Sequence, residues 1–100
     1  MYIYVSHEFG GKAENIERAK KITHDLQIAD MDNVYICPLL ALSHLEYGEL
    51  GYDAEIDLCK DLMCIFDKMV VASRISEGVR REIEFAKELH WEVDFLENPS

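Results

Sequence analysis

The sequence predicts an α/β domain in which a mostly parallel sheet of four or five strands lies between two layers of helices. Two observations lead to this prediction. Short apolar runs typical of buried strands alternate with longer segments in which apolar residues recur at helical spacing. Each helical segment also separates two strand-like runs, and such alternation favours parallel strands joined by right-handed crossovers. The 100 residues are enough for one domain, 1–100, with a single modest core.

The first half of the chain predicts two strands and one helix. Residues 2–5 are four β-favouring residues in a row, which is typical of a central strand covered on both faces. A turn at 7–11 breaks this strand, and a helix is expected over about 13–27. The second strand is expected at 34–37, where Pro38 ends it because proline lacks the N–H that a sheet ladder needs.

The second half predicts two further helices and two further strands. Residues 39–51 indicate a partly ordered loop over a sheet edge. A helix is expected over 52–66, a buried strand over 68–72 and a second helix from 76 to about 90. The last strand is expected at 91–96, where apolar and polar residues alternate. This order is typical of a three-layer Rossmann- or flavodoxin-like sandwich.

Composition narrows the classes of partner. The net charge is −10 and the basic residues are scattered, so we expect no nucleic-acid polymer and no membrane as a partner. The three cysteines, Cys37, Cys59 and Cys64, have no CxxC spacing and favour a reducing compartment. No signal peptide precedes the first strand, so a cytoplasmic protein is expected. The histidines and carboxylates show no ligand spacing, and we expect neither a metal nor a cofactor.

The helix after the third strand carries the sharpest signal. Ser76 is the expected N-cap, because its hydroxyl can accept a hydrogen bond from a first-turn N–H. The face expected in the core is formed by Val79, Ile83, Ala86 and His90. Glu82 lies on the flank of this stripe, and a carboxylate directed toward a core is costly without a partner or a task. Apolar neighbours would raise the pKa of Glu82, whereas cations and the helix start would lower it, which leaves the direction open.

Two glycine-containing turns are expected at one edge of the sheet. Gly10 and Gly11 follow the first strand, and Gly78 follows the third strand. In parallel sheets, ligands bind outside the carboxyl ends of the strands. A strand, a glycine turn and a helix can also place a phosphate at the helix start, although Gly-Gly is common in ordinary turns.

Two motifs of the chain resemble the nucleoside 2-deoxyribosyltransferase superfamily. The first combines Tyr4–Ser6 with Gly10 and Gly11 and with residues 14–19, and the second, more specific motif is residues 75–86. The superfamily includes the transferases, the 2'-deoxynucleoside 5'-monophosphate N-hydrolases and small uncharacterised bacterial and phage domains. The chain looks most like this last group.

The resemblance implies a role for each matching residue. Glu82 matches the carboxylate nucleophile, Tyr4 a tyrosine that orients it, and Asp57 is the candidate for the acid or the sugar-hydroxyl binder. The ligand and phosphate surroundings would be formed by Ser6, Gly10, Gly11, Ser76 and Gly78. Because neighbouring subunits often complete the site in this superfamily, a homodimer or larger homo-oligomer is expected.

The implied reaction is N-glycosidic bond cleavage or transfer on a (deoxy)nucleoside or its 5'-monophosphate. Glu82 would attack the anomeric carbon, and water or a second base would resolve the ester with retention of configuration. The alternative is a non-catalytic nucleotide-binding module, a sensor or sequestering protein. A third possibility is a structural or interaction domain in which an arginine pairs with Glu82.

Overall fold

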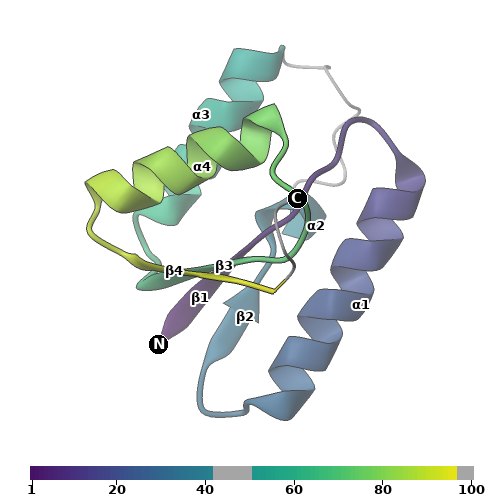
Figure 1. Ribbon diagram of the computed structural model, residues 1–100, viewed down its shortest axis with the longest axis vertical. Coiled ribbons are helices and arrows are strands. Elements are labelled where there is room, and N and C mark those ends of the chain that lie inside the picture. The colour runs from purple at the N-terminus through teal and green to yellow at the C-terminus, as the bar shows by residue number, and fades with distance from the viewer. Residues whose placement is uncertain (42–50, 97–100) are drawn as a thin grey trace.

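The computed structural model describes residues 1–41 and 51–96 and confirms the predicted fold class (Figure 1). Within this part of the chain, four strands form one all-parallel sheet in the order β2-β1-β3-β4. The strands are β1 (Tyr2–Ser6), β2 (Val34–Ile36), β3 (Lys68–Val71) and β4 (Glu92–Phe95). The first three were expected from apolar runs and β4 from its alternation of apolar and polar residues, and each boundary agrees with the prediction to within one residue.

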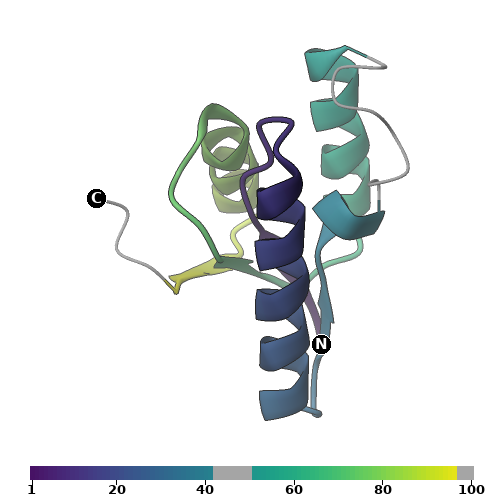
Figure 2. The ribbon, with the colours of Figure 1, turned by 90° about the vertical axis from the view of Figure 1, so that its right-hand side faces the viewer.

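Helices cover both faces of the sheet. The described helices are α1 (Ala13–Ala29), α2 (Pro38–Ala41), α3 (Tyr52–Met63) and α4 (Glu77–Glu88). Figures 1 and 2 show α1 on one face and α3 and α4 on the other. In residues 1–41 and 51–96, no helix is long and apolar enough to cross a membrane.

The segment expected to be a loop begins with a helix instead. Pro38 ends β2 as predicted, but it also opens the short helix α2. Proline fits the first turn of a helix because its fixed φ is helical and its missing N–H would have no intrahelical partner there. The rest of the predicted loop, residues 42–50, lies outside the described residues.

The period of two along β1 separates the core into two parts. Tyr4 faces α3 and α4, where it packs against Phe66 at a ring distance of 5.2 Å together with Met63 and Ile83. Its neighbour Val5 faces the other way and packs with Ala19 of α1. Successive side chains of a strand point to opposite faces, so one short strand serves both layers.

Helix α4 begins as the sequence predicts and ends earlier. The Ser76 hydroxyl accepts a hydrogen bond from the Val79 N–H at 3.3 Å, and Val79, Ile83 and Ala86 are buried. The prediction that His90 belongs to this buried face is wrong. The helix ends at Glu88, and His90 lies beyond it with a φ of 60° and an exposed side chain. A residue in this left-handed conformation leaves the helical spiral and no longer follows its spacing.

Removal of the α4 cap is expected to cost about 1 kcal/mol of stability in Ser76→Ala, because a first-turn N–H loses its partner. Ser76→Thr retains a hydroxyl and is expected to keep most of this stability. Urea unfolding of both variants measures the difference. Equal stability of Ser76→Ala and the wild type would show that the cap contributes nothing.

Candidate functional site

Glu82 on α4 meets two side chains of β1. Tyr4 and Ser6 lie two residues apart on β1, so both point toward α4, and each is 1% exposed. The Ser6 hydroxyl donates a hydrogen bond of 2.6 Å to Glu82 Oε2. The Tyr4 hydroxyl donates a second hydrogen bond to the same carboxyl group. The three residues therefore form one polar group at the carboxyl end of β1, beside the apolar core.

Burial raises the pKa of the Glu82 carboxyl to about 7, and the hydrogen bonds from Ser6 and Tyr4 oppose this shift. The residue as a whole is only partly buried, but its carboxyl end lies deep enough for desolvation to outweigh both donors. The pKa of Glu82 is therefore raised, a direction that the sequence alone leaves open. Near neutral pH both the carboxylate and the carboxylic acid are populated, which is a property of groups that take part in proton transfer or nucleophilic attack.

The arginines that precede Glu82 in α4 contact other carboxylates. Arg80 pairs with Glu77 at 2.7 Å, and Arg81 pairs with Asp53 at 3.1 Å. Within the described residues, the hydrogen bonds to the Glu82 carboxyl come from β1 rather than from a guanidinium. The pairing expected for a purely structural Glu82 is not the one observed.

The loops that follow β1 and β3 lie at the same edge of the sheet, as predicted, but Gly78 lies in the first turn of α4 rather than in the loop. Strands β1 and β3 are parallel neighbours, and the loops that follow them are joined by a 2.9 Å hydrogen bond from the Glu8 N–H to Ser73 Oγ. Gly10 and Gly11 are exposed and have φ values of 59° and 74°. A side chain at Gly10 would meet no atom within 4 Å, so the positive φ is what requires glycine there.

The remaining predicted site residues lie at the start of α4 and on α3. Ser76 and Gly78 flank the first residue of α4, and the Ser76 hydroxyl is engaged as the cap. Asp57 lies exposed on α3, and the structure does not bring it into the group of Glu82, Tyr4 and Ser6. The spacing along α3 accounts for this, because Met63 faces the core and Asp57 lies on a different side of the helix.

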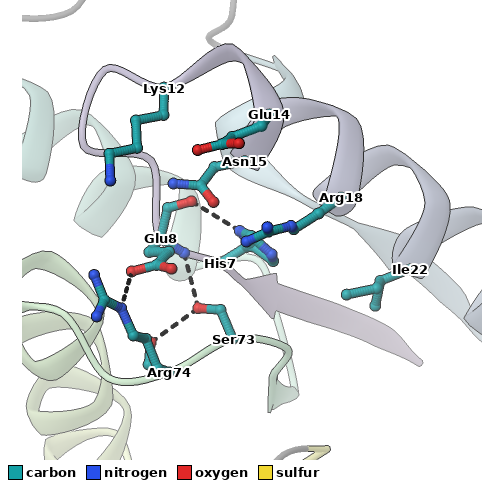
Figure 3. Close-up of a pocket in the computed structure, with 9 residues that line it drawn as sticks. All are labelled: His7, Glu8, Lys12, Glu14, Asn15, Arg18, Ile22, Ser73 and Arg74. Carbon is teal, nitrogen blue, oxygen red and sulfur yellow. Dashed lines mark hydrogen bonds and ion pairs between the residues drawn. The ribbon is translucent and has the colours of Figure 1, made fainter.

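Sequence reasoning missed a pocket of about 430 Å³ on the α1 side of the sheet (Figure 3). It is lined by His7, Glu8, Lys12, Glu14, Asn15, Arg18, Ile22, Ser73 and Arg74. These residues come from the β1–α1 loop, from α1 and from the loop after β3. Eight of these nine residues are ordinary polar or charged residues of the two loops or of α1, and the ninth is Ile22. The one feature of the sequence that could have predicted the pocket is that its two loops follow strands β1 and β3, which are neighbours in the sheet.

The buried thiol near this edge is not a nucleophile. Cys37 is a free cysteine, and burial raises its pKa to about 11. The thiol is therefore protonated at neutral pH, and a protonated thiol is a poor nucleophile. Cys64 is exposed on the surface.

No protein-family model, curated protein or solved structure matches the chain.

Proposed function

We propose that the chain cleaves the N-glycosidic bond of a (deoxy)nucleoside or its 5'-monophosphate, or transfers the sugar to a second base, with Glu82 as the nucleophile. One observation carries this proposal: the desolvated carboxyl group of Glu82 is held by the Ser6 and Tyr4 hydroxyl groups at the carboxyl end of β1. That is the edge at which ligands of parallel sheets bind. The motif resemblance assigns the same residue to the same role.

In the proposed first step, a carboxylate oxygen of Glu82 attacks the anomeric carbon. The bond between this carbon and the base nitrogen breaks, its electron pair leaves with the base, and a glycosyl ester forms on Glu82. Two hydrogen bonds restrain the orientation of the carboxylate, which lowers the entropic cost of reaching the attack geometry. Water or a second base then attacks the same carbon and frees Glu82, so that two inversions give net retention.

The environment of Glu82 suits a nucleophile in two ways. Desolvation makes the ionised carboxylate more reactive, because fewer solvent hydrogen bonds must be broken before attack. The donors Ser6 and Tyr4 limit the rise of the pKa, so a useful fraction of Glu82 remains ionised at neutral pH.

One observation favours the non-catalytic alternative. The leaving base needs a proton, and Asp57, the residue assigned to this step by resemblance, is exposed on α3. A site that holds a nucleotide without a positioned acid would bind it without rapid turnover. The nucleotide-binding module is therefore retained as the second candidate function.

The proposal is tested by chromatography of free base released from a panel of 2'-deoxynucleosides and their 5'-monophosphates. We expect release by the wild type and a decrease of at least about a thousandfold in Glu82→Gln, since the nucleophile is removed. Glu84→Gln is the matched control, because Glu84 is an exposed carboxylate of the same helix.

The other outcomes separate the candidate functions. Thermal stabilisation by a nucleotide, without base release from any member of the panel, would replace the enzyme with the binding module. Equal release by the wild type and Glu82→Gln would show that Glu82 is not the nucleophile. If no base is released and no nucleotide stabilises the protein, both candidate functions are contradicted.

A further inference from the structure

The pocket on the α1 side of the sheet gathers positive charge that is rare elsewhere in this protein. Lys12, Arg18 and Arg74 come from three different elements and surround one pocket (Figure 3). The whole chain has only 10 lysines and arginines and a net charge of −10. A local excess of cations on an acidic protein selects for anions at that place.

Two of these cations are available to a ligand. Arg74 Nε pairs with Glu8 Oε2 at 2.8 Å, and this pair forms one wall of the pocket. In the part of the chain that the structure describes, Lys12 and Arg18 form no ion pair. Glu14 is the lining carboxylate that opposes them. One carboxylate against two available cations leaves the interior of the pocket with a positive balance.

The start of α1 contributes hydrogen-bond donors beside these cations. No side chain caps α1 at Lys12, whereas Ser76 caps α4. The loop before α1 is held in place by a 2.8 Å hydrogen bond from Asn15 Nδ2 to the Phe9 carbonyl oxygen. Uncapped first-turn N–H groups and the positive end of the helix dipole both favour an anion.

His7 supplies a buried polar group to the same pocket. Its side chain lines the pocket although the residue is only 9% exposed. His7 Nδ1 lies 2.8 Å from the Glu8 carbonyl oxygen, and a carbonyl can only accept, so Nδ1 carries the hydrogen. When the ring carries this one hydrogen, Nε2 is an acceptor, and within the described residues it has no hydrogen-bond partner. Such an acceptor fits the P–OH group of a singly protonated phosphate better than a carboxylate, which offers no hydrogen.

We propose that this pocket is an anion site that binds the phosphate group of a small metabolite. Arg18 and Lys12 would bind the charged phosphate oxygens, and His7 Nε2 would accept the P–OH hydrogen. The site is separate from Glu82, because Ser6 directs its hydroxyl to Glu82 on the α4 side whereas the adjacent His7 lines the pocket on the α1 side. The proposal does not depend on glycosidase activity.

The test is a titration of the ¹⁵N-labelled protein with inorganic phosphate at constant ionic strength, followed by two-dimensional NMR. We expect saturable shifts in the amides of residues 7–15 and 73–74. Arg18→Gln and Lys12→Gln are each expected to raise the dissociation constant about tenfold, since each removes a charge-assisted hydrogen bond. Lys20→Gln is the matched control, because it removes the same charge from an exposed position of α1.

Each result supports or overturns the site. The site is overturned if the shifts do not saturate or if they are confined to residues 76–82. It is also overturned if Arg18→Gln and Lys20→Gln have the same dissociation constant. Tighter binding of succinate than of phosphate would overturn the assignment to phosphate. Unchanged binding by Glu82→Gln supports a separate site, and lost binding contradicts it. The same spectra show whether each variant is folded. If Arg18→Gln disturbs α1, Lys12→Gln still tests the site, because Lys12 lies in an exposed loop.

Discussion

Glu82→Gln is expected to be more stable than the wild type by about 2 to 3 kcal/mol at pH 8, and this gain is expected to shrink to about 1 kcal/mol at pH 5. The cause is the buried carboxyl group, whose pKa rises from 4.5 to about 7 on folding. Glutamine has a similar shape and can keep hydrogen bonds with Ser6 and Tyr4, but it has no charge to desolvate.

The sign follows from proton binding in the two states. Between pH 4.5 and about 7 the folded protein keeps the Glu82 proton while the unfolded chain loses it. Stability of the wild type therefore falls as pH rises through this range and stays level above it, as far as Glu82 contributes. In Glu82→Gln this contribution is absent. The residue is thus expected to decrease stability at the pH at which its ionised form would act.

Urea unfolding of both proteins at several pH values from 5 to 8 measures this difference. Glu84→Gln is the control, since Glu84 is exposed and its replacement is expected to give a small change without this pH dependence. A constant loss of stability in Glu82→Gln at every pH would show that the carboxyl group is not desolvated in the folded state.

For the proposed enzyme, kcat/KM for base release is expected to rise roughly a hundredfold between pH 5 and pH 8, with a midpoint near 7. The reason is that only the ionised form of Glu82 can attack the sugar, and its pKa is about 7. Tyr4→Phe removes a hydrogen bond that favours the charged form. Its profile is therefore expected to move to higher pH by about one pH unit.

Tyr35→Phe is the matched control for this profile. Tyr35 donates its hydroxyl hydrogen bond to Asp30 at 2.8 Å, away from Glu82, so its loss is expected to leave the midpoint unchanged. A rate that falls from pH 5 to pH 8 would instead assign Glu82 as a general acid. An unmoved midpoint in Tyr4→Phe would show that Tyr4 does not tune the carboxyl group.

The fold and part of the site could be predicted from local patterns. The run at 2–5 predicts a strand buried on both faces, and the spacing of Val79, Ile83 and Ala86 predicts the buried face of α4. The position of Ser76 predicts its cap. The same α4 spacing places Glu82 at the margin of the core. These features depend on residues close in sequence, because strand period, helix period and capping are properties of single elements.

The sequence alone thus determined the fold class, the order of the four strands and the placement of Glu82 beside the core. Only the tertiary structure decided that the pKa of Glu82 rises, because its hydrogen-bond partner Ser6 is 76 residues away and its desolvation depends on every packed element. Packing also decided that Asp57 faces solvent and that loops after β1 and β3 enclose a cationic pocket with α1. Desolvation and pocket shape each depend on many residues that are distant in sequence. Local periodicity describes single elements and therefore cannot predict either property.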